Sequence, residues 1–306
     1  MARKWKADRI PDQAGRLAIV TGANSGIGFD TAQELGKAGA TVILACRSDE
    51  KGKEAAGRTL AKHPQARLSV ETLDLASLAS VRAFAAAICR EHRRLDLLIN
   101  NAGVMMPPER TLTEDGFELQ FGINHLGHFA LTALLLDLMV GTDGSRVVTV
   151  SSSAHRWGDI DFDDLNWERR TYRRMPSYGQ SKLANLLFTF ELQRRLEQVG
   201  APTAALAAHP GWTGTNLQRH SGAIRRLNPV FSMKPWQGAL PTLYAATASD
   251  AEGGAYYGPD GLMGLRGYPT RVATSDAALD FEAAERLWRV SEELTGVRCT
   301  VRRLGG

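Results

Sequence analysis

The stretch at residues 21–28 constrains the fold more than any other part of the chain. It reads Thr-Gly-Ala-Asn-Ser-Gly-Ile-Gly, follows an apolar run at residues 17–20 and precedes a helical pattern at 29–37. This order predicts a strand, a tight turn and a helix N-terminus, where backbone N–H groups bind an anionic phosphate. Glycine permits positive φ and close approach of a ligand to the backbone. The spacing is G-x-x-x-G-x-G rather than G-x-G-x-x-G, so by itself the stretch also fits an ordinary glycine-rich βα turn.

Strand-like and helix-like segments alternate along the chain. Apolar strands are expected at residues 16–21, 41–45, 68–73, 95–99, 147–150 and 203–208. Helices are expected at residues 27–37, 49–62, 78–91, 114–139, 181–198 and 276–294. Continuous apolar strands that alternate with helices predict a parallel sheet with helices on both faces. Without a repeat, a linker or a break in composition, residues 1–306 are expected to form one doubly wound α/β domain, with 1–14 as an N-terminal extension.

Composition excludes several classes of protein. Hydrophobic residues make up 43% and charged residues 23%, which is ordinary soluble usage and argues against disorder or a fibre. The net charge of +4 comes from scattered Lys and Arg, so no nucleic-acid partner is expected. No apolar run reaches membrane-spanning length, and the basic N-terminus lacks the apolar core of a signal peptide. That terminus is expected to be a frayed, solvated end, with contact to an anionic membrane surface as the alternative.

The cysteines bear on compartment and metal binding. Cys46, Cys89 and Cys299 are odd in number, far apart and without metal-ligand spacing. We therefore expect a reduced, cytoplasmic protein without a disulfide framework or metal.

The end of the second strand bears on the cofactor. An acidic residue there would select NAD, but the sequence continues Cys46-Arg47-Ser48. The guanidinium of Arg47 suits a 2′-phosphate, which predicts NADP(H); a solvated surface arginine is the alternative. Asp74-Leu75 follows the third strand, where it could meet the adenine end of a cofactor or simply cap a helix. Asn100–Gly103 follows the fourth strand and could bridge strands beside a ligand or form an ordinary turn.

The candidate chemistry lies later in the chain. Tyr178 and Lys182 are four residues apart, on one face of a helix. A phenol titrates near ~10, so a neighbouring ammonium and a cationic nicotinamide would be needed to lower its pKa for acid–base work. The alternative is a surface pair. The serines at 151–153 end the fifth strand, at the edge where α/β sheets bind ligands, and one of them could hydrogen-bond a carbonyl oxygen.

Together these motifs resemble the short-chain dehydrogenase/reductase family. The stretches 21–28, 100–103 and 151–153, the pair Tyr178 and Lys182, and His209-Pro210-Gly211 occur in the family's order, over about residues 16–215. The stretches 45–47, 124–129 and 181–185 look most like the retinol dehydrogenase-type branch, which also resembles plant-type protochlorophyllide reductases. The resemblance implies a Rossmann-type fold and leaves a homodimer open.

The resemblance also implies roles for individual residues. Tyr178 would be the acid–base, Lys182 would lower its pKa and bind the nicotinamide ribose, and Ser152 would hold the substrate oxygen, with Ser151 and Ser153 as fallbacks. Asn124 would hold the helix and an ordered water of the proton relay. The expected cofactor-binding residues are Gly22, Asn24, Ser25, Gly26, Ile27, Gly28, Arg47, Asp74, Leu75, Asn101, Ala102, Gly103, Tyr178, Lys182, Pro210, Gly211, Thr213 and Thr215.

The chain departs from the family pattern in one place. Ser152 and Tyr178 are 26 residues apart, about twice the usual spacing, so residues 156–176 are interpreted as an inserted flap near the substrate mouth or as a surface loop. His125, His128 and His155 are expected to be structural. Residues 212–236 combine Gly, Pro and apolar side chains, which suggests a substrate lid, with core packing as the alternative.

The sequence therefore predicts an NADP(H)-dependent oxidoreductase. Its substrate would be a small, lipophilic alcohol or carbonyl compound. A catalytically silent dinucleotide-binding sensor or scaffold is the alternative.

Overall fold

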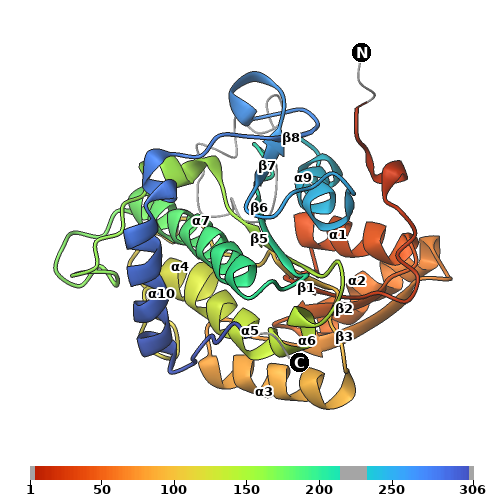
Figure 1. Cartoon of the computed structure of the whole chain (residues 1–306), viewed down its shortest axis with the longest axis horizontal. Helices are drawn as coiled ribbons and strands as arrows, with labels where there is room; N and C mark the ends of the chain where they lie inside the picture. The colour runs from red at the N-terminus through yellow and green to blue at the C-terminus, as the bar shows by residue number, and fades with distance from the viewer. Residues whose placement is uncertain (1–3, 214–232, 303–306) are drawn as a thin grey trace.

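The computed structural model describes residues 4–213 and 233–302. In this part of the chain, eight strands form one sheet in the order β3-β2-β1-β4-β5-β6-β7-β8 (Figure 1). The strands are β1 (Leu17–Thr21), β2 (Thr41–Cys46), β3 (Arg67–Thr72), β4 (Leu97–Asn100), β5 (Arg146–Val150), β6 (Ala204–Ala208), β7 (Tyr256–Pro259) and β8 (Pro269–Arg271). Neighbouring strands are parallel except β7 and β8, which are antiparallel. The expected parallel sheet is confirmed for the first seven strands. At one edge the sheet differs from the expectation, because β8 is antiparallel to β7.

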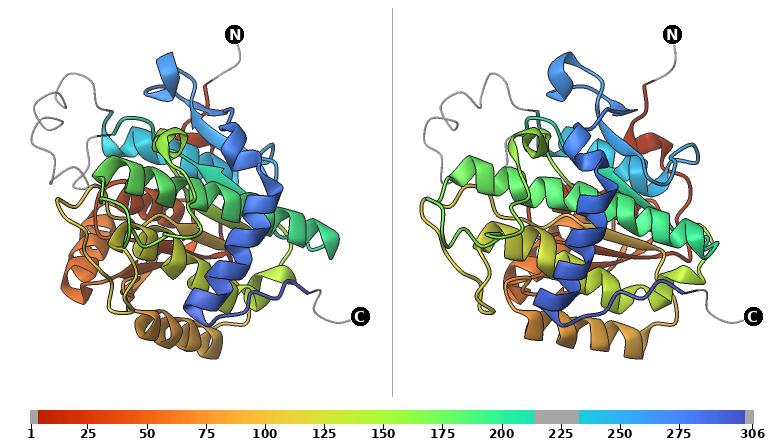
Figure 2. Two further views of the ribbon diagram at one scale, coloured as in Figure 1. Left: turned by 90° about the vertical axis from the view of Figure 1, so that its left-hand side faces the viewer. Right: turned by 60° about the vertical axis from the view of Figure 1, so that its left-hand side comes forward.

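Helices cover both faces of the sheet, as predicted. Figure 1 shows α1 (Gly26–Lys37), α2 (Asp49–Lys62) and α9 (Pro235–Thr247) on one face. The other face carries α3 (Leu78–Glu91), α5 (Gly127–Leu135) and α7 (Arg174–Gln198). Figure 2 shows that α10 (Phe281–Thr295) crosses over α7, which places it outside that layer. Apolar residues from both faces of the strands are buried, so the sheet lies between two hydrophobic cores.

The strand order places a crevice at the centre of the sheet. β1 pairs with β2 on one side and with β4 on the other, so Ile19 is a neighbour of both Ile43 and Leu98. The connections after β1 and after β4 therefore leave the sheet in opposite directions. In doubly wound sheets, ligands bind at the carboxyl ends of the strands at such a switch point.

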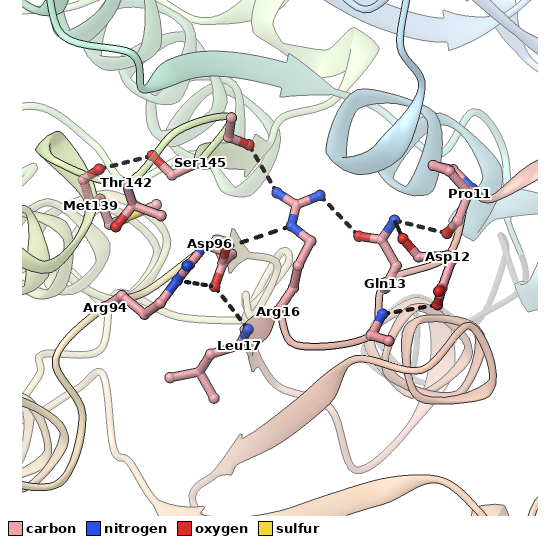
Figure 3. Close-up of polar contacts among 12 residues, drawn as sticks. Pro11, Asp12, Gln13, Arg16, Leu17, Arg94, Asp96, Met139, Thr142 and Ser145 are labelled. Atoms are coloured by element: carbon pink, nitrogen blue, oxygen red, sulfur yellow. Dashed lines mark hydrogen bonds and ion pairs between the residues drawn. The ribbon is translucent and has the colours of Figure 1, made fainter.

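At the amino ends of the strands, the buried carboxylate of Asp96 joins β1 to β4. Asp96 precedes β4 and is 1% exposed. Its Oδ2 accepts a hydrogen bond of 2.9 Å from the backbone N–H of Leu17, at the start of β1. The guanidinium groups of Arg16 and Arg94 form ion pairs with the same carboxylate (Figure 3). The Asp96 charge is thus fully paired, and it joins the starts of the two central strands.

The continuous helix expected at residues 114–139 is wrong. Leu112 pairs with Glu118 in an isolated bridge, and Gly116 between them has a φ of +85°, so this segment is a turn. The helical part comprises α4 (Leu119–Phe121), a π-helical turn at Gly122–Leu126, then α5 and α6 (Asp137–Val140). A single π turn inserts one residue into a helix, and residues 122–126 are all buried, so the sequence lacks the polar face whose shift would reveal the insertion.

Other element boundaries also differ from expectation. The six predicted strands lie within two residues of their observed bounds. The helix expected to begin at Ser181 begins at Arg174, which places Tyr178 within α7. Helix α9 and strands β7 and β8 were not predicted. The last helix begins at Phe281 rather than Asp276, and Leu279 lies in a preceding 3-10 turn where it is 52% exposed.

The expectation of a frayed N-terminus is wrong for its described residues. The Trp5 ring packs edge-on against Tyr244 of α9 at a centroid distance of 5.3 Å. Lys4 lies over the ring of Tyr268, and Ile10 packs against the core on the α1 face. Aromatic and apolar contacts therefore hold the extension against the sheet layer. Most of the expected lid, and Thr215 with it, lies outside the described residues.

Candidate active site

A cavity of about 520 Å³ opens at the carboxyl edge of the sheet. Its walls come from the segments that follow β1, β2, β3, β4, β5 and β6, together with the start of α7. Of the expected site residues, those that line it are Gly22, Asn24, Ser25, Gly26, Ile27, Gly28, Arg47, Asp74, Leu75, Asn101, Ala102, Gly103, Ser152, Tyr178, Lys182, Pro210, Gly211 and Thr213. Motifs spread over most of the sequence are thus brought to one site.

The glycine turn after β1 has the geometry that a phosphate requires. Gly22 and Gly26 have φ of +68° and +58°, a region that favours glycine. A Cβ on Gly28 would lie 2.6 Å from the carbonyl oxygen of Gly22, so a side chain there would close the turn. Helix α1 begins at Gly26, which brings its N-terminal N–H groups to the cavity wall. A pyrophosphate fits these groups, because both the free backbone donors and the helix dipole favour an anion.

Basic residues occupy the cavity beside β2. Arg47 directly follows β2 and is exposed, and Ser48 and Lys51 line the same wall. The Ser48 hydroxyl accepts a hydrogen bond from the Lys51 backbone N–H and caps α2. Asp74 is the one carboxylate in the described lining. Its Oδ1 accepts a 2.9 Å hydrogen bond from the N–H of Ala76, which is the capping role considered for it from the sequence.

The turn after β4 is tied to β1, as the bridging interpretation predicts. The Asn101 side chain donates to the Thr21 carbonyl at 2.8 Å. The backbone N–H groups of Asn101 and Ala102 both donate to Thr21 Oγ1 at 2.9 Å. A Cβ on Gly103 would lie 3.0 Å from Asn124 Oδ1 and 3.7 Å from Lys182 Nζ, so this glycine allows three segments to meet.

Tyr178 and Lys182 lie one turn apart on α7 and both line the cavity. Lys182 Nζ lies 5.7 Å from the centre of the Tyr178 ring and donates a 3.0 Å hydrogen bond to the Val150 carbonyl at the end of β5. Lys182 is 4% exposed. In contrast to Asp96, this buried charge is held by a neutral carbonyl.

Burial dominates the protonation of this pair. It raises the pKa of Tyr178 to about 12, while a hydrogen bond from Ser152 acts in the opposite direction. Burial lowers the pKa of Lys182 to about 8. The sequence predicts a lowered tyrosine pKa, and in the protein alone the direction is the opposite. The reason is that removing the phenolate from water costs more free energy than the hydrogen bond from Ser152 supplies.

Asn124 lies behind the cavity wall, in the π-helical turn, and is fully buried. Its Oδ1 accepts a hydrogen bond from the Val104 N–H at 2.8 Å. Its Nδ2 donates to the Val104 carbonyl at 3.0 Å and to Ser181 Oγ at 2.9 Å. The side chain thus joins the β4 loop to α7, which fits the expected role of holding the helix.

Sequence reasoning missed an apolar wall of the cavity. Met105, Met106, Trp157 and Met175 line it, and Met106 packs directly on Tyr178. Met106 has a φ of +51°, and its N–H donates to Gln120 Oε1 at 2.7 Å. The apolar residues directly after the Asn-Asn-Ala-Gly motif could have indicated this wall. The positive φ of Met106 has no sequence signal.

The inserted segment at residues 156–176 is anchored to α4 and α7. Gln120 of α4 donates to the Tyr172 hydroxyl and to Ser177 Oγ, both at 3.0 Å. Gln180 of α7 donates to the Leu165 carbonyl at 2.8 Å. Trp157 at one end of the segment and Met175 next to its other end reach the cavity. These contacts favour the flap interpretation over that of a surface loop.

The three histidines expected to be structural are buried. Burial lowers the pKa of His125 to about 3 and that of His128 to about 4, and it also lowers the pKa of His155. In the described ranges no group of three or more His, Cys, Asp or Glu side chains could hold a metal ion. Across residues 4–213 and 233–302, every helix is too short or too polar to cross a membrane.

The sheet topology, the glycine turn and the Ser152, Tyr178 and Lys182 cluster define a dinucleotide-binding protein of Rossmann type. A model of the short chain dehydrogenase family matches residues 16–225. Retinol dehydrogenase 13 of Homo sapiens is 48% identical over 298 residues, which covers 92% of this chain and 85% of the relative. The chain therefore belongs to the short-chain dehydrogenase/reductase family, as a retinol dehydrogenase-like oxidoreductase.

Solved structures agree with this assignment. A crystal structure of an uncharacterized protein from Mycobacterium paratuberculosis is 46% identical with a TM-score of 0.83, and the match covers 98% of this chain and 100% of that one. The RhlG/NADP active-site complex of Pseudomonas aeruginosa is 26% identical with a TM-score of 0.62, over 79% of this chain and 94% of that one.

Proposed function

We propose that this protein is an NADP(H)-dependent oxidoreductase that transfers a hydride between the nicotinamide and an apolar alcohol or carbonyl compound. The observation that carries the proposal is that one cavity joins the glycine turn and Arg47 to Tyr178 and Lys182. A phosphate-binding region and a proton-transfer pair in one cavity fit a cofactor whose reactive end meets a second substrate.

The choice of NADP(H) rests on the wall beside β2. Arg47, Ser48 and Lys51 supply donors and positive charge where a 2′-phosphate would lie. The RhlG structure of Pseudomonas aeruginosa is an active-site complex with NADP. When bound, the nicotinamide would supply or accept the hydride, and the protein would contribute placement and electrostatics.

The proton would be handled by the side chains of α7 and β5. Tyr178, with its raised pKa, holds a proton at neutral pH and can donate it from Oη to a carbonyl oxygen. Ser152, beside it in the cavity, can hold that oxygen through its hydroxyl. The Lys182 ammonium would stabilise the phenolate that forms. In the oxidation direction the same groups would act in reverse.

The apolar wall supports a lipophilic substrate. Met105, Met106, Trp157 and Met175 line the cavity with apolar surface, which binds hydrocarbon in preference to polar groups, and Met106 lies in one buried cluster with Tyr178. A relative named for retinol acts on a compound of this kind. A cytoplasmic location, a homodimer, a single domain and a lid at 212–236 stay predictions.

Substituting Tyr178 tests this function against that of a silent sensor or scaffold. Y178F should retain NADPH binding, measured by cofactor fluorescence, and lose turnover on a panel of apolar aldehydes by a factor of at least about 100. Y172F is the matched control. Tyr172 is half-buried, and burial raises its pKa to about 12 as it does for Tyr178, but Tyr172 does not line the cavity. Wild-type turnover in Y178F would remove Tyr178 as the acid.

A further inference from the structure

His128 connects two parts of the site that the sequence treats separately. It lies on α5, one turn after Asn124, and is 1% exposed. Its Nδ1 is 3.0 Å from the backbone carbonyl oxygen of Asn124. Its Nε2 is 2.9 Å from the hydroxyl oxygen of Thr21, at the end of β1. Both ring nitrogens are thus engaged, each with a residue of a different functional segment.

The partners define the tautomer of this ring. A carbonyl oxygen can only accept a hydrogen bond, so Nδ1 carries the proton that binds Asn124. Burial and the nearby positive charge of Lys182 lower the pKa of His128 to about 4, so the ring is neutral at pH 7. Nε2 then has a free lone pair and accepts a hydrogen bond from the Thr21 hydroxyl. The Thr21 hydroxyl also lies 3.2 Å from the Ile99 carbonyl, a longer contact.

Each end of this contact continues into the site. On the cofactor side, Thr21 Oγ1 accepts the N–H groups of Asn101 and Ala102, which line the cavity. On the catalytic side, the Asn124 amide donates to Ser181 Oγ, and that hydroxyl donates to the Tyr178 carbonyl at 2.8 Å. Buried and partly buried hydrogen bonds, joined through the backbone and side chain of Asn124, therefore lead from the turn after β4 to the backbone of Tyr178.

We propose that His128 is a positioning residue that couples the cofactor-binding turn to the catalytic helix through its neutral, Nδ1-protonated ring. The proposal rests on the proposed function, since it takes Tyr178 as the proton donor. His128 touches neither substrate nor cofactor. It acts by holding Thr21 and Asn124 in register, so that cofactor binding and the orientation of α7 depend on the same side chain.

Two substitutions separate the two contacts. In H128N the amide nitrogen stands near the position of Nδ1, so the Asn124 contact is kept and the Thr21 contact is lost. In H128Q the amide oxygen stands near Nε2 and keeps the Thr21 contact only. We expect H128N to raise the Kd for NADPH about five- to tenfold with kcat little changed, and H128Q to lower kcat by a similar factor with Kd little changed.

His125 supplies the matched control. It lies in the π-helical turn, is also 1% exposed, and its Nε2 contacts Ser291 Oγ of α10 at 2.9 Å. H125N and H125Q should lower the melting temperature without separating Kd from kcat. If H128N does not yield folded protein, H128Q still tests the proposal, because it should lower kcat with the Kd for NADPH little changed.

Two results would overturn the proposal: His128 variants that lower only the melting temperature, as the His125 variants do, or variants that change Kd and kcat by equal factors. Either result can occur while Y178F still loses turnover, which would leave the proposed function intact. Conversely, wild-type turnover in Y178F would contradict the proposed function, while the effect of H128N on NADPH affinity would still test the Thr21 contact.

Discussion

The amino ends and the carboxyl ends of the central strands each carry a buried charge, and the two charges have different partners. At the amino edge, the Asp96 carboxylate meets two guanidinium groups and a backbone N–H (Figure 3). At the carboxyl edge, the Lys182 ammonium meets the Val150 carbonyl and the Tyr178 ring, with no carboxylate among its described contacts. Both side chains are nearly inaccessible, at 1% and 4% exposure respectively.

The difference indicates what each edge is built for. Removing one partner of a paired, hydrogen-bonded buried charge destabilises the fold, whereas a buried charge without a counter-ion itself costs stability and has a shifted pKa. The Asp96 contacts at the amino edge therefore stabilise the sheet, and the carboxyl edge leaves the Lys182 ammonium without a counter-ion in the cavity wall. The comparison predicts that substitutions at the two edges change stability with opposite signs.

The largest expected effect on stability is at the amino edge. D96N keeps the shape of the side chain but removes the charge that faces Arg16 and Arg94, and it weakens the bond to the Leu17 N–H. We expect a loss of about 2–3 kcal/mol in the free energy of unfolding, measured by urea denaturation. NADPH affinity should not change. D143N, an exposed carboxylate at the same edge, should change stability by less than about 0.5 kcal/mol.

A smaller effect of opposite sign is expected for K182M. It removes the buried charge, and the Val150 carbonyl keeps a hydrogen bond of 3.1 Å from Asn185. We expect a gain of about 1–2 kcal/mol in unfolding free energy at pH 7, together with loss of turnover. K53M, at an exposed lysine, should do neither. A destabilised K182M would contradict the contrast between the edges.

The pH dependence sharpens the same prediction. Lysine titrates near 10.5 in the unfolded chain, and Lys182 titrates at about 8 in the folded protein. Between these values the unfolded state binds more protons, so wild-type stability gains a rising contribution as pH increases through this window. K182M should lack that contribution, which unfolding curves at pH 7, 8, 9 and 10 would measure.

The smallest effect on stability is expected for R47D, at an exposed position in the cavity wall beside β2. Its unfolding free energy should change by less than about 0.5 kcal/mol, while the Kd for NADPH should rise about 10- to 100-fold and the Kd for NADH much less. R67D makes the same charge change at the amino end of β3, where the side chain is also exposed, and should leave both affinities unchanged. Equal losses for both cofactors in R47D would exclude a 2′-phosphate contact.

The sequence predicted the strands and the segments that line the cavity well but the irregular segments poorly. Five of the six predicted strands are buried on both faces and therefore form short apolar runs between polar segments, whereas β3 is partly exposed, with the apolar Leu68 and Val70 alternating with polar residues. The π-helical turn that holds Asn124 was missed because residues 122–126 are all buried and so lack a polar face that would reveal an inserted residue. The positive φ of Met106 was missed because it depends on Gln120, a partner 14 residues away.

The sequence by itself determined the fold class, the glycine turn and the tyrosine–lysine pair proposed for proton transfer. Each of these follows from local patterns: apolar alternation, backbone freedom at Gly22 and Gly26, and a tyrosine and lysine one helical turn apart. Only the tertiary structure decided how the side chains are protonated and how the segments are joined. Burial sets the pKa of Tyr178 and of Lys182, and His128 meets Thr21 across 107 residues. Desolvation and long-range hydrogen bonds depend on what surrounds a group in space, and that is absent from its neighbours along the chain.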